Sequence, residues 1–176
     1  MRLIVLITII FMNAYTAFSS DHSIEDIRKK YQLAVYDSKV ANVLSERLNK
    51  IDKPDALTLA YKGSTFALKA KHAWNPYAKL EYMNSFDEII NEAVRRNSED
   101  IEIRFLRYSV QLNTPKYLGL SKNLSEDKSK IVSLILQKKF KDKDKKLIAE
   151  IYQFMLKSNV LTAAEREQLL AVLKTI

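Results

Sequence analysis

The shortage of chain-breaking residues is the feature that most constrains the fold of this chain. Only 2 glycines and 3 prolines occur in 176 residues. An all-β fold needs turn residues at about every 8–12 positions, and this chain lacks them. Strong helix formers fill the long segments between the few breakers. The sequence therefore predicts an all-α protein.

The first 19 residues predict export. Arg2 precedes an unbroken apolar run from Leu3 to Met12, and Ala17-Phe18-Ser19 has the small-x-small pattern of a signal peptidase site. The run has about half of the ~20 residues that a membrane-spanning helix needs. We expect residues 1–19 to be a signal peptide cleaved near Ser19, and the protein to be periplasmic or secreted. An uncleaved N-terminal anchor is the alternative, and it also implies export.

Residues 20–176 have the length of a single domain, because a chain of about 150 residues can bury roughly 68–70% of its unfolded surface. The absence of cysteine excludes disulfides, thiolate catalysis and a cysteine-linked lipid anchor. The formal net charge of +8 favours acidic partners or anionic surfaces.

Apolar periodicity and capping residues divide this domain into about six or seven helices. One apolar stripe runs from Ile24 to Asn49 and predicts a single helix there. The later helices are expected from Asp55 to about Ala73, from Pro76 to about Val94, from a Ser98 cap to about Leu112, from a Ser125 cap to about Lys139, over 147–155, and from a Thr162–Glu165 capping box onward.

The segment Ile101 to Phe105, "IEIRF", alternates apolar and polar residues as a half-buried strand does. No second strand-like run exists to pair with it, and a lone strand leaves its backbone hydrogen bonds unmade. We therefore assign this segment to a helix.

The stretch "KHAWNPYAKLEYM", Lys71 to Met83, gathers the only tryptophan, one of two histidines and one of three prolines. Asn75 suits a helix N-cap and Pro76 the first helical position. Trp74 is expected to pack against the new helix as a staple residue. His72 is expected in the last turn of the preceding helix, where a cation is favoured. The stretch therefore predicts a corner between two helices and not an active site.

Two stretches 45 residues apart, "DALTLAYKGS" from Asp55 and "DIEIRFLRYS" from Asp100, suggest a helix-pair repeat. The segment from Ser85 to Arg107 resembles a junction of two tetratricopeptide repeats. Its aromatic and small positions are Phe86, Ile89, Ile90 and Ala93, its turn is Asn97 to Asp100, and in "AYKG" Gly63 permits close helix packing.

The tetratricopeptide resemblance implies antiparallel helical hairpins and a role in binding proteins or peptides. The chain as a whole is similar to small exported helical proteins of Bacteroidota-type bacteria, a likeness that implies no particular activity. If the repeated helices stack, Lys62 and Arg107 fall at equivalent places. The candidate partner-binding residues are Lys62, Lys69, Arg104, Arg107, Tyr61 and Tyr108. The alternative is that these cations are separate, solvent-facing side chains whose stems cover apolar surface.

The run "KKFKDKDKK" is most simply a solvated connection between two helices. Its alternative role is contact with an anionic envelope polymer or an acidic partner, in which lysines act as point charges. The lysines of this run are Lys138, Lys139, Lys141, Lys143, Lys145 and Lys146. The predicted export argues against nucleic acid as a partner.

Residues for catalysis or cofactor binding are scarce. A Ser-His-Asp triad would have to use His72, but the sequence contains no G-x-S-x-G elbow of the kind found in serine hydrolases. Two remote histidines without cysteine do not make a zinc site. Ser125 to Lys128 is an S-x-x-K string, but the S-D-N and K-T-G elements that accompany it in penicillin-binding enzymes are missing. Two glycines cannot build a phosphate-binding loop. We expect no catalytic residue, metal or cofactor.

The sequence thus predicts an exported, non-catalytic helical protein that binds a protein or peptide partner in the cell envelope. A basic module that docks on anionic envelope material is the second hypothesis. An enzyme of unknown type, acting through His72 or facing carboxylates, is the third.

Overall fold

The computed structural model describes residues 23–140, 144–158 and 160–173. All regular structure in these ranges is helical, which confirms the all-α prediction. The predicted signal peptide lies outside the described residues. The helices are α1 (Ile24–Ala34), α2 (Ser38–Asn49), α3 (Ala56–His72), α4 (Pro76–Arg96), α5 (Ile101–Leu112), the 3-10 helix η2 (Lys116–Leu118), α6 (Leu124–Leu136), α7 (Lys145–Lys157) and α8 (Ala163–Leu173).

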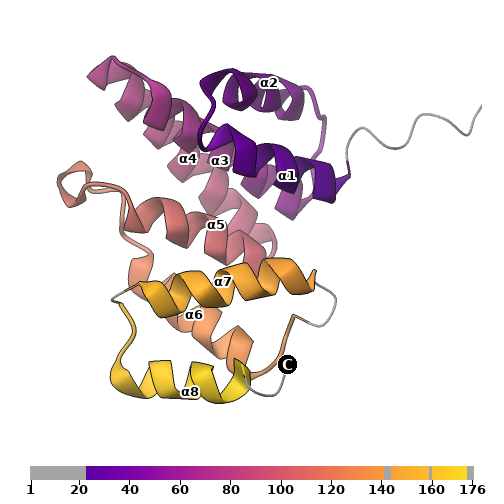
Figure 1. Ribbon diagram of the computed structural model, residues 1–176. Coiled ribbons are helices and arrows are strands. Elements are labelled where there is room, and N and C mark those ends of the chain that lie inside the picture. Colours follow the sequence, from indigo (N-terminus) through magenta and orange to yellow (C-terminus); the bar gives the residue numbers. More distant parts are fainter. Residues whose placement is uncertain (1–22, 141–143, 159, 174–176) are drawn as a thin grey trace, which may run out of the picture.

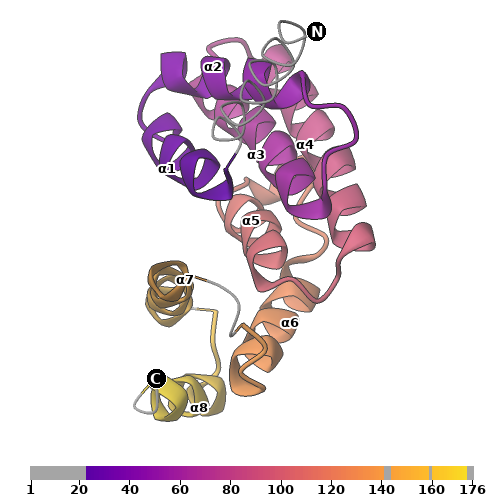
Figure 2. The same ribbon diagram turned by 90° about the vertical axis from the view of Figure 1, so that its right-hand side faces the viewer.

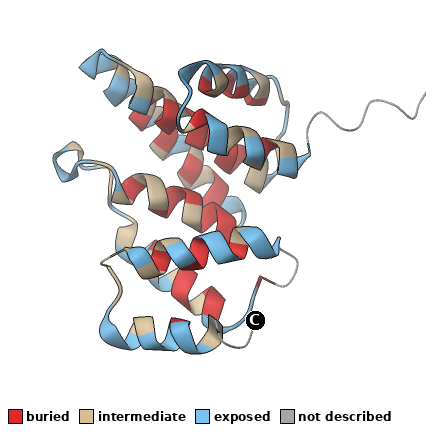
Figure 3. Cartoon of the chain, viewed as in Figure 1, coloured by how far each residue is buried: buried red, intermediate tan, exposed pale blue. Residues whose placement is uncertain are grey.

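The helices form two groups that meet at α5 (Figure 1). Helices α1–α4 pack together on one side of α5, and α6–α8 lie on its other side. Ile103 and Leu106 of α5 belong to the core shared with α1–α4, whereas Ile101 and Tyr108 belong to the core shared with α6–α8. Helix α5 is therefore buried from both sides, and the buried residues run through the middle of the molecule (Figure 3).

The predicted helix from Ile24 to Asn49 is two helices, so the chain has eight α-helices in the described residues and not six or seven. Val35 to Asp37 separate α1 from α2, and the Asp37 carboxylate accepts hydrogen bonds from the backbone N–H of Lys39 at 2.8 Å and Val40 at 3.3 Å. The break was missed because the apolar stripe continues in phase across it and contains neither glycine nor proline.

Gly63 lets α3 and α4 approach closely, as expected. A Cβ atom at this position would lie 3.1 Å from Ile89 Cγ2 and 3.2 Å from the backbone nitrogen of Ile90. Both distances are shorter than ordinary van der Waals contact, so a larger residue would push the two helices apart.

The corner between α3 and α4 is largely as predicted. Asn75 caps α4 by accepting a 2.8 Å hydrogen bond from the backbone N–H of Tyr77, and Pro76 is the first helical residue. His72 ends α3, with Nε2 3.0 Å from the carbonyl oxygen of Ala34. The staple prediction for Trp74 is wrong, because this side chain is 98% exposed.

The helical assignment of "IEIRF" is confirmed, but two predicted caps are wrong. Asp100, and not Ser98, caps α5 by accepting from the backbone N–H of Glu102 at 2.8 Å. Helix α6 begins at Leu124, one residue before the predicted Ser125 cap.

The Thr162–Glu165 capping box is confirmed. The backbone N–H of Thr162 donates to Glu165 Oε2 at 2.7 Å, and the backbone N–H of Glu165 donates to Thr162 Oγ1 at 3.2 Å. Within the described residues, each helix is too short or too polar to cross a membrane.

Candidate binding cleft

A cleft of ≈ 560 Å³ lies between α1 and α7, which sequence reasoning did not anticipate. Residues of α1 line one side of the cleft, and residues at and near the start of α7 line the other side. Tyr61 of α3 and three residues of α5 complete the lining between these two sides. Figure 2 shows α1 and α7 apart, with α5 set to one side between them. The cleft therefore lies where the two helix groups meet.

An ion pair fixes the floor of this cleft. Arg28 of α1 donates from Nε to Glu102 Oε1 and from Nη2 to Glu102 Oε2, both at 2.7 Å. The Tyr61 hydroxyl donates to the same Oε1 at 2.7 Å. Glu102 is 1% exposed and Tyr61 is 3% exposed, so these three side chains hold one geometry with little competition from water.

The electrostatics of the floor follow from these contacts. Hydrogen bonding to Glu102 raises the pKa of Arg28, which stays a cation. Burial, and then the charge of Glu102, raises the pKa of Tyr61 well above its ordinary value, so its hydroxyl remains a donor. The floor is thus a preorganised and internally neutralised group rather than an isolated charge.

The walls of the cleft are partly apolar. Leu33 of α1 is 55% exposed, and Leu147 of α7 and Phe105 of α5 are half-buried. Exposed leucine alone is ordinary on a protein surface. Here Leu33 and Leu147 line the same cleft, so a ligand bound between α1 and α7 removes apolar surface from water.

The rim of the cleft carries charges of both signs. Glu25 and Lys29 belong to α1, Lys146 and Glu150 to α7, and Asp144 caps α7. A 3.1 Å hydrogen bond from Gln32 Nε2 to Glu150 Oε2 crosses the cleft. A ligand with both charged and apolar groups matches such a lining, and its arrival competes with this exposed hydrogen bond.

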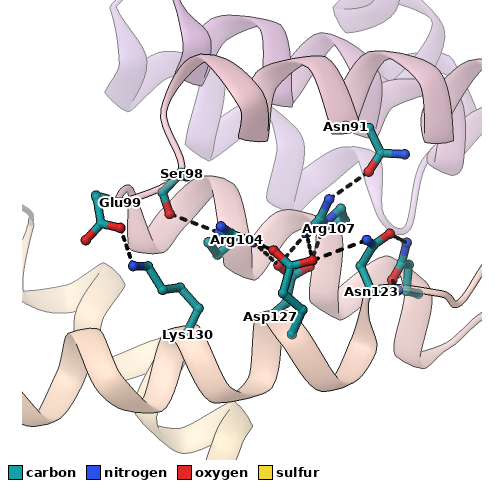
Figure 4. Close-up of polar contacts among 10 residues, drawn as sticks. Asn91, Ser98, Glu99, Arg104, Arg107, Asn123, Asp127 and Lys130 are labelled. Carbon is teal, nitrogen blue, oxygen red and sulfur yellow. Dashed lines mark hydrogen bonds and ion pairs between the residues drawn. The ribbon is translucent and has the colours of Figure 1, made fainter.

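Arg104 and Arg107, two of the predicted binding residues, are buried, with only 6% and 4% of their surface exposed. Both guanidinium groups point to Asp127 of α6, which is fully buried (Figure 4). Arg107 donates from Nε to Asp127 Oδ2 at 2.6 Å and from Nη2 to Oδ1 at 2.7 Å, and Arg104 donates from Nη1 to Oδ1 at 2.8 Å. These arginines join α5 to α6.

The same arginines also bind other helices and turns. Arg107 Nη1 donates to Asn91 Oδ1 of α4 at 2.7 Å, and Arg104 Nε donates to the carbonyl oxygen of Ser98 at 3.0 Å (Figure 4). Arg104 also forms an ion pair with Glu126, and this contact lowers the pKa of the Glu126 carboxyl. Since so many of their donors are engaged, the two cations are structural.

The other four predicted residues do not share one face. Tyr61 lies at the cleft, but Tyr108 is 1% exposed and packs edge-on against Phe154, with ring centroids 6.3 Å apart. Lys69 is half-buried over the ring of Tyr82, with Nζ 4.6 Å from the centroid. Lys62 is half-buried on α3. Tyr61 is thus the one predicted binding residue that lines the cleft.

The lysine run lies partly within the described residues. Lys138, Lys139, Lys145 and Lys146 are exposed, whereas Lys141 and Lys143 lie outside the described residues. Lys139 is 3.8 Å from Glu99, and Lys146 lines the cleft. The exposure of these four lysines agrees with either role that the sequence allows.

The residues weighed for catalysis lie apart from the cleft. His72 contacts the carbonyl oxygen of Ala34, and Lys128 of the S-x-x-K string forms an ion pair with Glu165 at 2.9 Å. In the described part of the chain, no group of three or more His, Cys, Asp or Glu side chains is placed to hold a metal ion.

A scan against protein-family models finds no match, and neither do searches of curated proteins and of solved structures.

Proposed function

We propose that this chain binds a peptide segment of another protein in the cleft between α1 and α7 and catalyses no reaction. The observation that carries the proposal is the lining of the cleft: exposed or half-buried apolar walls, a rim of mixed charge and a floor fixed by the Arg28–Glu102 pair. Ligand sites are commonly largely preformed, apolar concavities with a few fixed polar groups.

The size and chemistry of the cleft favour a peptide segment as its occupant. Its volume of ≈ 560 Å³ lies within the ~300–1,000 Å³ of ordinary ligand sites. Leu33 and Leu147 offer room for apolar side chains, and Lys29 and Glu150 offer ion pairs at the rim. A peptide is the common ligand that brings both kinds of group along one backbone.

The state of Glu102 supports binding over catalysis. Its two carboxylate oxygens accept hydrogen bonds from Arg28 and Tyr61. A general acid or base must come within hydrogen-bond reach of the reacting proton, and Glu102 is only 1% exposed beneath Arg28 and Tyr61. Among the described residues, the cleft lining contains no histidine.

We further propose that this binding occurs outside the cytoplasm, in the periplasm or after secretion. The signal-peptide pattern of residues 1–19 supports this placement. The tetratricopeptide-like arrangement of helical hairpins stays a prediction, supported by the close approach at Gly63 and by the turn between α4 and α5.

Peptide selection followed by crosslinking tests the proposed binding site. A random displayed peptide library is selected on the immobilised protein, and recovered peptides are mixed with a variant that carries a photoreactive residue at position 33. Val43 of α2 is the matched control position, because it is also aliphatic and is 64% exposed but does not line the cleft. The proposal predicts crosslinking from position 33 and none from position 43. Recovery of no peptide, or equal crosslinking from both positions, contradicts it.

Docking on anionic envelope material through the lysine run is a second candidate, supported by the exposure of Lys138, Lys139, Lys145 and Lys146. It predicts binding to an anionic polymer that weakens steeply as salt is added. Binding that is insensitive to salt, or unchanged when these lysines are replaced by glutamine, contradicts this candidate.

A further inference from the structure

Three aromatic side chains in the group of helices α1–α4 are almost fully exposed. Trp74 is 98% exposed, Tyr36 is 88% exposed and Tyr77 is 84% exposed. We call these three residues the aromatic corner. None of them lines the α1–α7 cleft, so the proposed peptide site does not account for them.

Contacts between α3 and the turn after α1 bring the aromatic corner together. Lys71 Nζ donates to the carbonyl oxygen of Val35 at 2.7 Å, and it also lies 5.5 Å from the centroid of the Tyr36 ring. His72, one residue on, contacts the carbonyl oxygen of Ala34. Tyr36 therefore lies beside the end of α3. Trp74 and Tyr77 come within five residues after that end in the sequence.

The chemistry of these side chains suits a boundary between water and hydrocarbon. Tryptophan and tyrosine have an apolar body and a polar tip, and both are enriched where membrane proteins cross the headgroup level. Leu80, one turn after Tyr77 on α4, is 42% exposed and extends the apolar surface. Transfer of an exposed aromatic ring from water to a lipid interface buries apolar surface and is therefore favourable.

Cations accompany the aromatic corner. Three lysines are exposed and lie within three positions of an aromatic residue of the corner in the sequence: Lys39, Lys71 and Lys79. The nearest acids in the sequence are Asp37, whose carboxylate is engaged in capping α2, and Glu81, which is exposed. Lysine near a bilayer that contains anionic lipid gains electrostatic attraction, and the formal net charge of +8 acts in the same direction.

We propose that the aromatic corner docks this protein on the surface of a bilayer containing anionic lipid. Trp74, Tyr36 and Tyr77 enter the headgroup region, while Lys39, Lys71 and Lys79 meet the lipid phosphates. This is peripheral attachment, in which the helices lie on the membrane and do not cross it. The site is separate from the peptide cleft, so either proposal can fail without the other.

A lipid surface fits this corner better than a protein does. Protein interfaces place their aromatic anchors in well-packed pockets formed with the partner, and they are depleted in lysine. Here the rings project from a turn and a helix–helix corner and are accompanied by lysines. A soft, negatively charged bilayer accepts projecting rings and lysines together.

The fluorescence of Trp74 tests the proposal directly, because it is the only tryptophan in the chain. The protein is titrated with vesicles of phosphatidylcholine alone, or of an equimolar mixture with phosphatidylglycerol. The proposal predicts that mixed vesicles shift the emission to the blue and protect Trp74 from acrylamide. It also predicts that neutral vesicles do so far less and that added salt reverses the effect.

Two sets of variants connect the signal to the corner while keeping Trp74 as the probe. Lys39→Gln/Lys79→Gln leaves the Lys71 contacts in place and is expected to weaken vesicle binding by about fivefold per lysine. The matched control Lys138→Gln/Lys145→Gln removes the same charge from the lysine run and is expected to leave binding nearly unchanged. Tyr36→Ser/Tyr77→Ser is expected to weaken binding to the mixed vesicles while circular dichroism keeps its helical signal.

Three results would overturn the proposal. One is vesicle cosedimentation without any change in Trp74 emission, which places the contact elsewhere. Another is a larger loss of binding in the Lys138/Lys145 control than in the corner variant, which assigns docking to the lysine run. The third is a Trp74 emission spectrum that no vesicle changes. If a second protein shifts that spectrum and vesicles do not, the aromatic corner binds a protein and not a bilayer.

Discussion

Arg28 and Glu102 are 74 positions apart in the chain, yet two parallel hydrogen bonds of 2.7 Å join them. The pair connects the first helix to α5, the helix shared by both cores, and it forms the floor of the α1–α7 cleft. The fold and the proposed binding site therefore share this contact.

Replacing Arg28 by methionine is expected to lower the free energy of unfolding by about 3 kcal/mol, because the buried Glu102 carboxylate loses its cation. Urea denaturation measures this change. Arg95→Met is the control, since Arg95 forms an exposed ion pair with Glu92, and such pairs contribute little. Equal effects of the two substitutions would contradict the structural role of Arg28.

Asp127 is expected to be the most sensitive residue of the α5–α6 junction. Asp127→Asn removes the carboxylate that neutralises Arg104 and Arg107, and it should destabilise the protein by about 3–5 kcal/mol. Glu126→Gln changes the neighbouring acid, whose side chain is 55% exposed, and should have a much smaller effect. A thermal melt of each variant measures the difference, and a Tm unchanged by Asp127→Asn would show that the buried network is not needed.

Local features of the structure were predictable from sequence, and tertiary partners were not. Asn75 with Pro76 and Thr162 with Glu165 start helices as predicted, because a cap depends on residues within one turn. The burial of Arg107 was missed because its partner Asp127 is 20 positions away. The sequence does contain a signal for this junction: two arginines one turn apart on one helix, and acidic residues in the first turn of another helix.

The cleft was beyond sequence reasoning for the same reason. Its two sides come from opposite ends of the domain, and the Gln32–Glu150 contact joins residues 118 positions apart. Periodicity indicates which face of a helix is apolar, but it does not say which helices stop short of full contact. The exposure of Trp74 was missed likewise, because the staple geometry requires a neighbour that the corner does not supply.

Replacing Tyr152 by phenylalanine is expected to stabilise the protein by about 1 kcal/mol. Tyr152 is fully buried, and its hydroxyl has no hydrogen-bond partner among the described residues, so its removal relieves a desolvation cost. Tyr117→Phe, at an 86% exposed position, is the control and should change nothing. A loss of stability in Tyr152→Phe, measured by urea denaturation, would reveal a partner for the hydroxyl.

Alkaline pH provides a second test of Tyr152. Burial raises the pKa of Tyr152 from 10.0 to about 12, so the unfolded state loses this proton before the folded state does. Ionisation of Tyr152 therefore leaves the free energy of unfolding unchanged below pH 10 and lowers it as pH rises from 10 toward 12. Denaturation midpoints should fall over this window, and they should fall less in Tyr152→Phe. Parallel pH profiles would contradict the assigned shift.

Acid should weaken the α1–α2 contact. Hydrogen bonding to Arg47, at 2.5 Å between Nη1 and Oδ2, lowers the pKa of Asp26 below its ordinary 3.8. A lowered folded-state pKa contributes stability above the ordinary value, and this contribution is lost as pH falls through the folded-state value. Asp26→Asn should therefore be less stable than the parent at neutral pH, and the gap should narrow as pH falls below 3.8. A constant gap across this range would contradict the prediction.

The affinity of a library-selected peptide for cleft variants tests the central claim most directly. Fluorescence anisotropy gives the Kd for the parent protein, for Leu33→Glu and for the control Val43→Glu. Because Leu33 lines the cleft and Val43 does not, binding in the cleft predicts a loss of about tenfold or more for Leu33→Glu and an unchanged Kd for Val43→Glu. An unchanged Kd for Leu33→Glu, or equal losses for both variants, would contradict the assignment of the cleft as the binding site.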